Sequence, residues 1–400
     1  MRILLLNDFL YPSFIGGVER RNADLAVALA RRGHEVTLIG FGEGPARPEP
    51  GVRYESLGPL GKLYDARGKR RTMQSLRFAA RAWTLDLSRF DLVETASVPY
   101  IHLVPLALRC RLRGIPLVVT WYEFWGPYWA SYLGGFRAPV YRAIEGFVAR
   151  LGTRIVATSR LTARRLEKHL PRRRPVAVVP CGVHLDEVRA AAPSEGAREA
   201  DIVFAGRMIA EKRIDLLLEA AALLPEARVV VYGEGPDEKR LMAIAARLGV
   251  ETRVDFRGHV EEATPVWREI ARSKIAVQPS SREGFGIFPL EAMALGTPVV
   301  FVDWPDSAIP ELVRDGVEGV MSPPDAASFA RALKSLLEDA GRRSAMGEAG
   351  RRRASIYDWS RVAARLDEIF SGLVASPGSA SRDKREGEIA AGREERPSGR

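Results

Sequence analysis

Short apolar runs alternate with amphipathic helical stretches along nearly the whole of this 400-residue chain. An apolar run of a few residues between two helical patterns is typical of a strand in a parallel sheet that helices cover on both faces. The runs that fit this pattern cover residues 3–6, 36–39, 92–94, 117–120, 155–157, 176–179, 202–205, 228–232, 254–256, 275–278 and 299–302. The alternation therefore predicts an α/β protein with doubly wound parallel sheets.

The chain is too long for one ordinary hydrophobic core, so we expect two domains. Between residues 186 and 200 the periodic pattern gives way to Ala, Pro, Ser, Gly and charged residues, just before a new strand. This break predicts a first domain at 1–185, a linker at 186–200 and a second domain at 201–356. Residues 375–400 have the composition of a disordered tail.

Apolar runs such as 115–121 and 298–302 are much shorter than the roughly 18 residues of a membrane-spanning helix, so we expect no such helix. The apolar run at the amino terminus is interrupted at Asp8, which favours a buried strand over a signal peptide. The two cysteines, Cys110 and Cys181, lack the close spacing of a zinc site or a disulfide framework. We therefore expect a cytoplasmic protein.

The formal net charge of +10 is compatible with a nucleic acid, an anionic membrane or a phosphorylated substrate as partner. Only the net charge favours a nucleic acid as partner, and we do not expect one. The densest basic stretch, residues 62–81, alternates Lys and Arg with apolar residues and precedes Trp83. It is either a solvated loop and helix face or an amphipathic segment that places the protein at the inner face of the plasma membrane.

The loops after the strands are where doubly wound domains bind their ligands. The first strand leads into Gly16 and Gly17, where an anion or a hydroxyl can approach backbone N–H groups. A tight turn without a ligand explains these glycines equally well.

A basic pair follows the strand at 202–205. Arg207 offers a planar fork of donors and Lys212 a point charge, which together suit the oxygens of a diphosphate. A surface salt bridge with Glu211 is the alternative.

The most informative segment follows the strand at 275–278. Small polar residues lead to Glu283, Gly284 and Gly286, and an apolar helix with Glu291 in it begins. The glycines let a ligand reach the helix amino terminus, where the helix dipole favours negative charge. Glu291 has apolar neighbours and is costly to bury without a partner such as a pair of ribose hydroxyls. The alternative is a capping role for Glu283 and an exposed Glu291.

The run from Glu283 to Glu291 resembles the E-x7-E motif of family 4 of the retaining glycosyltransferases, which have the GT-B fold. Further elements of that family occur in the same order along the chain. They are Gly16-Gly17-Val18-Glu19, Gly206-Arg207 with Glu211-Lys212, Gly233-Glu234-Gly235-Pro236 and Gly258-His259-Val260. The resemblance covers almost all of residues 1–374. It implies two Rossmann-like domains facing each other across a cleft, the first for the acceptor and the second for a nucleotide-sugar donor.

The resemblance also implies roles for single residues. Arg207 and Lys212 would neutralise the departing diphosphate and Glu283 would fix a hydroxyl of the donor sugar, so these three are the expected catalytic residues. Glu291 would hold the ribose hydroxyls, and the backbone of Val260 would meet the base. The other residues expected at the donor are Gly16, Gly17, Gly233, Gly284, Phe285, Gly286 and Ile287.

Retention in this family is attributed to front-face attack, in which the departing phosphate takes the acceptor's proton. No carboxylate nucleophile is then needed, in contrast to retaining glycosidases. The sequence has no Asp-x-Asp suitably placed after a strand to hold a divalent ion. We therefore expect neither a cofactor nor a metal, and activity that survives a chelator.

The loop after the strand at 117–120 resembles the family's sugar-contacting loop, with Tyr122, Glu123 and Trp125 as the expected acceptor or sugar contacts. Tyr122 stands where many members carry a histidine, which changes or removes a contact with the donor sugar. Aromatic residues crowd this loop and either stack on sugar rings, lie at a membrane interface or fill a core. They are Trp121, Trp125, Tyr128, Trp129 and Tyr132.

Tyr357-Asp358-Trp359-Ser360 resembles the start of the family's crossover helix, expected here at 357–374 and packed back on the first domain. Closure of the two domains would complete the site and exclude water. Pro180-Cys181-Gly182-Val183 stands where Pro-Asn-Gly-Val is commoner, and we expect this change at the hinge to be harmless.

We therefore expect a retaining, metal-independent glycosyltransferase with a nucleotide-sugar donor and a glycan, lipid-linked or small-molecule acceptor. It would act in the synthesis of a cell-envelope glycan, glycolipid or exopolysaccharide. Two alternatives remain: a nucleotide-sugar 2-epimerase of the same fold, and a non-catalytic nucleotide-sugar or glycan-binding protein, to which Tyr122 points. A nicotinamide dehydrogenase is set aside because no strand opens into G-x-G-x-x-G. The sequence does not indicate the oligomeric state.

Overall fold

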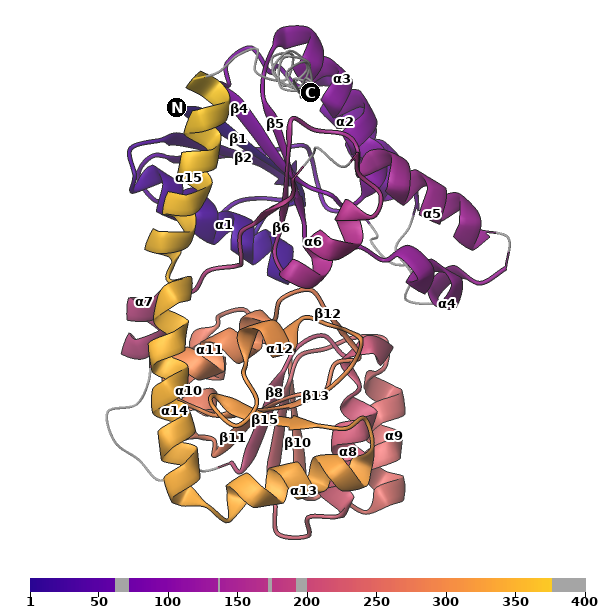
Figure 1. The fold of residues 1–400 in the computed structure, drawn as a ribbon, viewed down its shortest axis with the longest axis vertical. Helices are drawn as coiled ribbons and strands as arrows, with labels where there is room; N and C mark the ends of the chain where they lie inside the picture. Colours follow the sequence, from indigo (N-terminus) through magenta and orange to yellow (C-terminus); the bar gives the residue numbers. More distant parts are fainter. Residues whose placement is uncertain (62–71, 136, 172–174, 192–199, 376–400) are drawn as a thin grey trace, which may run out of the picture.

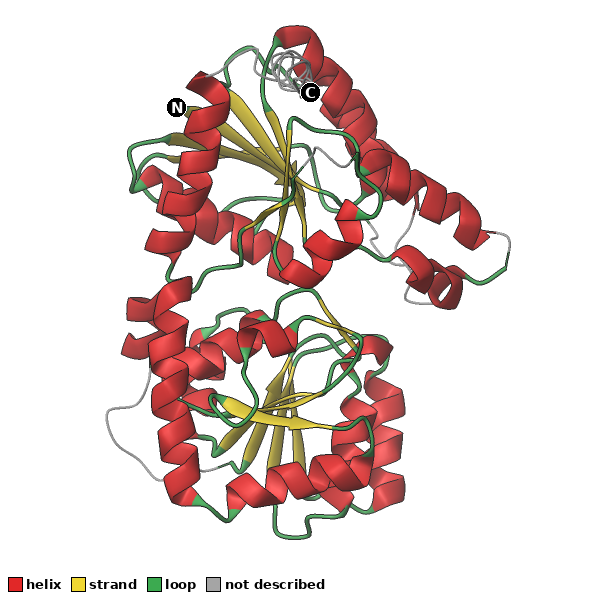
Figure 2. Ribbon diagram, viewed as in Figure 1, coloured by secondary structure: helices red, strands yellow, loops and turns green. Residues whose placement is uncertain are grey.

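The computed structural model describes residues 1–61, 72–135, 137–171, 175–191 and 200–375. Its strands form two large parallel sheets with helices on their faces, one above the other in Figure 1 and Figure 2. The predicted fold class, two doubly wound parallel-sheet domains, is confirmed. Residues 62–71 of the basic stretch and residues 376–400 of the expected tail lie outside the described residues.

The first sheet has the strand order β3-β2-β1-β4-β5-β6-β7. Its strands are β1 (Arg2–Phe9), β2 (Glu35–Phe41), β3 (Val52–Ser56), β4 (Leu92–Ala96), β5 (Leu117–Trp121), β6 (Arg154–Ala157) and β7 (Ala177–Val178). Each run predicted in this half of the chain contributes to a strand. The sequence did not reveal β3, because this edge strand is buried fully only at Val52 and so carries no apolar run.

The second sheet has the strand order β10-β9-β8-β11-β13-β15, and a separate pair joins β12 to β14. The strands are β8 (Ile202–Ala205), β9 (Val229–Tyr232), β10 (Val254–Gly258), β11 (Ile275–Gln278), β12 (Arg282–Glu283), β13 (Val299–Val302), β14 (Asp306–Ser307) and β15 (Gly319–Ser322). The five predicted runs are strands here as well. The strands that were missed are an edge strand and the two-residue pair, which are too short or too mixed to stand out.

Helices connect the parallel strands. In the first half they are α1 (Gly17–Ala30), α2 (Thr72–Thr84), α3 (Leu103–Arg113), α4 (Trp129–Leu133), α5 (Arg137–Val148), α6 (Arg160–Glu167) and α7 (Leu185–Ala190). In the second half they are α8 (Ile214–Ala222), α9 (Glu238–Leu248), α10 (Thr264–Arg272), α11 (Ile287–Leu295), α12 (Ile309–Leu312), α13 (Ala326–Leu337), α14 (Ala340–Ala354) and α15 (Trp359–Ala375). Short 3-10 turns are η1 (Tyr100–His102), η2 (Gly126–Tyr128), η3 (Ala210–Lys212) and η4 (Ser355–Tyr357).

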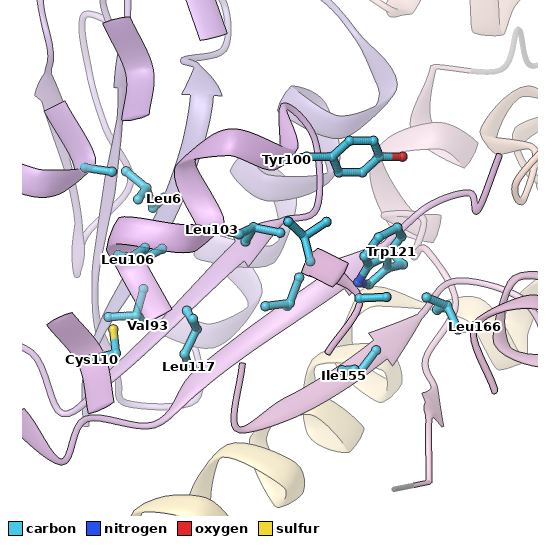
Figure 3. Packing of buried hydrophobic residues seen from close by; sticks show 14 of the residues in the cluster. Leu6, Val93, Tyr100, Leu103, Leu106, Cys110, Leu117, Trp121, Ile155 and Leu166 are labelled. Atoms are coloured by element: carbon cyan, nitrogen blue, oxygen red, sulfur yellow. The ribbon is translucent and has the colours of Figure 1, made fainter. Parts of the chain in front are cut away.

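The two faces of the first sheet have separate cores. Figure 3 shows one of them, where Leu6 and Trp121 belong to the same buried cluster as Leu103 of α3. On the other face, Leu25 and Leu29 of α1 share a buried cluster with residues of α15. The last helix in the described part of the chain, α15, therefore packs on the first domain, as Figure 1 shows in yellow.

Two segments join the domains and pair with each other. The N–H of Val183 donates to the carbonyl of Tyr357 (2.9 Å), and the N–H of Trp359 donates to the carbonyl of Val183 (3.1 Å). A Cβ atom at Gly182 would lie 2.4 Å from the Trp359 ring, so the contact requires glycine. The break expected at 186–200 begins with a helix, α7, because Leu185 and Val188 are buried, and residues 192–199 lie outside the described residues.

Candidate active site

The carboxyl ends of β8 and β11 bring a lysine and a carboxylate together. Lys212 Nζ lies 2.5 Å from Glu283 Oε2, and Gln278 Nε2 donates to the same oxygen at 2.8 Å. The two loops are also joined through the backbone, because the N–H of Ser281 donates to the carbonyl of Glu211 (2.8 Å). Two of the three residues expected to be catalytic are thus in direct contact, and both side chains are mostly buried.

Glu291 lies on α11 and is buried. Its Oε1 accepts a hydrogen bond from Trp267 Nε1 (2.8 Å) and pairs with Arg20 Nη1 (3.0 Å). The guanidinium of Arg20 also stacks on Trp267, with Cζ 5.2 Å from the ring centre. The alternative with an exposed Glu291 is therefore wrong. A buried carboxylate needs a partner, and an arginine of the first domain is one of the two partners of Glu291.

The loop that carries Arg207 is fixed by close backbone packing. Gly233 has a φ of 123°, and a Cβ atom there would lie 2.0 Å from the carbonyl oxygen of Gly206. Arg207 itself is exposed, and its positive charge lowers the pKa of Glu19 in the first domain. Burial raises the pKa of Glu19 to about 7, although the charge of Arg207 and a hydrogen bond with Asn7 lower it. Arg207, which we expect to bind the diphosphate, thus lies close enough to the first domain for its charge to affect Glu19.

The glycines of the motifs bring the two domains into contact. A Cβ atom at Gly284 would lie 2.2 Å from the carbonyl oxygen of Tyr122, and one at Gly17 would lie 3.5 Å from Ile287 Cδ1. Gly286 has a φ of 100°, which disfavours other residues there. The predicted donor loop is therefore also a contact surface between the domains.

Arg282 anchors this contact. Its Nε donates to Glu123 Oε2 (2.7 Å) and its Nη2 to the carbonyl of Phe124 (3.2 Å). The guanidinium carbon lies 5.5 Å from the ring centre of Trp125 and 4.4 Å from that of Tyr128. The loop expected to contact sugars therefore binds Arg282, the residue that directly precedes Glu283.

The aromatic loop is held from behind by one buried carboxylate. Glu145 accepts hydrogen bonds from Tyr100 Oη (2.7 Å), Trp125 N (2.8 Å), Gly126 N (2.7 Å) and Trp129 Nε1 (3.1 Å). Of the aromatic residues in this loop, Trp121 and Trp129 fill the core, whereas Trp125 and Tyr128 contact Arg282. Tyr128 also donates a hydrogen bond to Glu211, the alternative salt-bridge partner expected for the basic pair.

Tyr122 faces a buried polar cluster of the first domain. Its hydroxyl donates to Asn22 Oδ1 (3.4 Å), and the guanidinium of Arg21 lies 5.6 Å from its ring centre. Arg21 in turn pairs with Glu94 (2.9 Å), with both side chains fully buried. Burial raises the pKa of Tyr122, so the hydroxyl keeps its proton. The residue that replaces the familiar histidine therefore acts as a hydrogen-bond donor to its own domain.

The remaining predicted residues lie around the same strand ends. Phe285 is buried against Tyr357, with ring centres 5.7 Å apart, and Val260 and Ile287 are half-buried at the edge of the same apolar cluster. Gly16 caps α1, and a Cβ atom there would lie 2.3 Å from Glu19 Oε2.

Sequence reasoning missed the residues that connect the domains. Arg20 and Arg282 directly adjoin predicted motifs, so their position was visible, but their partners Glu291 and Tyr128 lie in distant parts of the chain. Trp267 gave no signal beyond its aromatic ring. Within the described ranges, no group of three or more His, Cys, Asp or Glu side chains is arranged to hold a metal ion.

Two family descriptions match the chain, one for each sheet. "Glycosyltransferase Family 4" matches residues 15–187, and "Glycosyl transferases group 1" matches residues 189–353.

Curated proteins of known activity are similar in sequence. The D-inositol 3-phosphate glycosyltransferase of Streptomyces avermitilis is 33% identical over 258 residues, which are 58% of this chain and 55% of that protein. The glycogen synthase of Mycobacterium tuberculosis is 26% identical over 403 residues, covering 92% of this chain and 94% of that protein. The chain thus spans about half the length of the first relative and most of the second.

Solved structures share the fold at low identity. Sucrose-phosphate synthase from Thermosynechococcus elongatus has a TM-score of 0.76 at 20% identity, covering 94% of this chain and 100% of that one. HepE of Anabaena in complex with UDP-glucose has a TM-score of 0.72 at 20% identity, covering 93% and 100%. WaaG, a glycosyltransferase involved in lipopolysaccharide biosynthesis, has a TM-score of 0.70 at 18% identity, covering 92% and 100%.

Proposed function

We propose a reaction for this chain from the premise that it belongs to glycosyltransferase family 4, the group 1 glycosyl transferases. The chain is a glycosyltransferase of the GT-B type. Our proposal is that it transfers a sugar from a nucleotide-diphosphate sugar with retention of configuration and without a metal ion. The family match sets aside both the epimerase and the non-catalytic alternative.

The contact between Lys212 and Glu283 is the observation that carries this proposal. A mostly buried carboxylate with a lysine 2.5 Å away can exchange this partner for a donor when the donor binds. The diphosphate would attract Lys212, and Glu283 would accept a hydrogen bond from a sugar hydroxyl. Both groups would then face opposite ends of the bond that breaks.

The leaving group would be stabilised by Arg207, Lys212 and the amino terminus of α11. The amides of Ile287 and Phe288 begin that helix, and helix geometry leaves them without an acceptor in the helix itself. Positive charge and oriented amides stabilise the charge that develops on the diphosphate as the glycosidic C–O bond breaks. The two cations supply the charge that a divalent ion supplies in other enzymes.

Retention would follow from attack on the face from which the diphosphate departs. The acceptor oxygen forms the new C–O bond there, and its proton passes to an oxygen of the departing phosphate. Glu283 is paired with Lys212 and Gln278, which suits a hydroxyl ligand better than a nucleophile.

The acceptor is proposed as a class. A glycan, a lipid-linked glycan or a small molecule is compatible with relatives named for D-inositol 3-phosphate, glycogen and lipopolysaccharide. We propose a role in the synthesis of a cell-envelope glycan, glycolipid or exopolysaccharide.

A donor screen tests the proposal. The melting temperature is measured with UDP-, GDP-, ADP- and TDP-sugars, with and without EDTA, for the wild type and for Glu291→Ala and Arg207→Ala. One nucleotide series should raise it, unaffected by EDTA, and both variants should lose the response. The anomeric configuration of the product, read by NMR, should match that of the donor. An inverted product or a requirement for metal would contradict the mechanism.

We also propose that the first domain docks on an anionic membrane through α2, α3 and α5, which lie on one side of that domain in Figure 1. Large apolar side chains on these helices are exposed, including Leu112 (74%), Met73 (69%), Phe147 (55%) and Trp83 (52%). The three helices carry several arginines, and their one acidic residue, Glu145, is buried. Apolar residues beside arginines suit the headgroup region of an anionic bilayer.

Liposome sedimentation tests the docking face. The protein should bind phosphatidylglycerol vesicles at low salt and release them at high salt, and Leu112→Ser with Phe147→Ser should weaken binding. Met242→Ser removes an exposed apolar residue from the second domain and serves as the control. Equal binding by all three proteins would refute this face.

None of the helices in the described ranges combines the length and apolar character needed to cross a bilayer.

A further inference from the structure

Arg20 reaches from the first domain into the donor site of the second. It lies on the first turn of α1, three residues after Gly17, and its side chain is mostly buried. Its Nη1 lies 3.0 Å from Glu291 Oε1, and its guanidinium stacks on Trp267. Trp267 donates to the same carboxylate oxygen (2.8 Å). Arg20 and Trp267 therefore form one supporting group for Glu291.

The two contacts leave the carboxylate with a defined free side. A carboxylate oxygen has two lone-pair sites, and at Oε1 both are occupied by the arginine and the indole. Among the described residues, the hydrogen bond from Trp267 and the ion pair with Arg20 both end on Oε1. Oε2 is thus the atom presented to a ligand. Two donors on one oxygen also restrain the orientation of the carboxylate.

We propose that Arg20 is a positioning residue for the ribose of the donor: it holds Glu291 from across the domain interface, so that Oε2 meets a ribose hydroxyl. The inference rests on the proposed function, since it takes Glu291 as the ribose ligand. It adds that ribose recognition depends on the first domain. A nucleotide would therefore be bound tightly only when the two domains are together.

The alternative, that Arg20 blocks the ribose site, conflicts with this geometry. A blocking cation would cover Oε2, the oxygen that we assign to the ribose, whereas Arg20 and Trp267 both contact Oε1. Asp24, one turn further along α1, lies 4.0 Å from Arg20 Nε and helps to keep the guanidinium in place.

The test compares ribose with 2′-deoxyribose ligands by calorimetry on the full chain. The probes are UDP and 2′-deoxy-UDP, or the pair with the base that the donor screen selects. We expect the wild type to prefer the ribose form by about tenfold, the size of one hydrogen bond to a charged group, and Arg20→Met to reduce the preference to about twofold. Arg20→Lys should keep part of the wild-type preference for ribose. In a Glu291→Gln background, Arg20→Met should have little further effect.

Each outcome has a distinct meaning. Arg31→Met removes a cation from an exposed position just after α1 and should leave the preference unchanged. If the wild type binds none of the nucleotides, the proposed function fails. If the wild type prefers ribose and Arg20→Met retains that preference, the function stands and the role of Arg20 is refuted. Tighter binding by Arg20→Met would identify Arg20 as a block and also refute the proposal.

Discussion

The guanidinium carbon of Arg282 lies 4.4 Å from the ring centre of Tyr128, although the two residues belong to different domains. The same side chain pairs with Glu123 and directly precedes Glu283. A contact between the domains is thus built into the chain next to an expected catalytic residue. A movement of one domain relative to the other would therefore also act on the residue next to Glu283.

Replacement of Arg282 by Leu should lower kcat/KM. The substitution removes an ion pair, a hydrogen bond to the carbonyl of Phe124 and contacts with two aromatic rings. A displacement of catalytic groups by about 1 Å costs about a hundredfold in rate, so we expect a loss of ten- to a hundredfold. Small-angle scattering with nucleotide should show a larger radius of gyration than for the wild type. Arg240→Met, at an exposed site on α9, should change neither quantity.

Replacement of Lys212 by Ala should reduce kcat by about a hundred- to a thousandfold, the usual effect of removing one stabilising donor from a developing anion. Steady-state kinetics with the donor from the screen would measure this effect. Glu283→Gln should also lose activity, because a neutral amide oxygen is a weaker acceptor for the sugar hydroxyl than the carboxylate is. Lys239→Ala removes an exposed lysine of the same domain. Comparable activity of Lys212→Ala and Lys239→Ala would exclude Lys212 from the reaction.

Glu19 should make stability depend on pH. Its pKa is raised from 4.5 to about 7, mainly by burial, so the folded state binds a proton that the unfolded state releases between these values. The contribution is fully present below pH 4.5 and is lost as pH rises to about 7, which amounts to roughly 3 kcal/mol. Glu19→Gln should remove this decline, so urea titrations should find it more stable than the wild type at pH 8 and similar at pH 4.5.

An exposed carboxylate provides the control for Glu19. Glu43→Gln, in a loop of the same domain, should leave the pH dependence of stability as it is in the wild type. A parallel decline of stability in Glu19→Gln and wild type would show that Glu19 is charged in the folded protein throughout this range.

Gly182→Ala should destabilise the protein. The added methyl group would lie 2.4 Å from the ring of Trp359, so the two segments that join the domains must separate, at a cost of about 1–3 kcal/mol. Gly372→Ala lies in α15 with open space around the new methyl group and should stabilise the protein by about 0.5–1 kcal/mol. Thermal unfolding of both variants distinguishes these opposite effects. A neutral Gly182→Ala would mean that the segments shift freely.

The strands could be predicted, and the motif from Glu283 to Glu291 could be recognised, because each lies within a short stretch of sequence. A buried parallel strand needs a continuous apolar run, and the segment from Glu283 to Glu291 combines its glycines and carboxylates within a single turn and helix. The edge strand β3 was not predictable, since half-exposed side chains carry no such run.

The contacts between the domains could not be predicted. Arg20 meets Glu291, and Arg282 meets Glu123, through the placement of two separate sheets, and no local pattern encodes that placement. The aromatic loop shows the same difficulty. Its composition was compatible with sugar stacking, a membrane interface or a core, and it took the position of Arg282 and Glu145 to show that Trp125 and Tyr128 serve an interface within the chain.

The packing of α15 on the first domain has a consequence for synthesis of the chain. Val362, Leu366 and Phe370 of α15 share a cluster with Ile3 and Leu5 of β1, so β1 is synthesised long before one of the helices that cover it. Until then, α1 covers this face of the first sheet only in part, and its remaining apolar side chains can contact other chains. A message cut short after the second domain would therefore yield a product whose weakness lies at the opposite end from the missing residues.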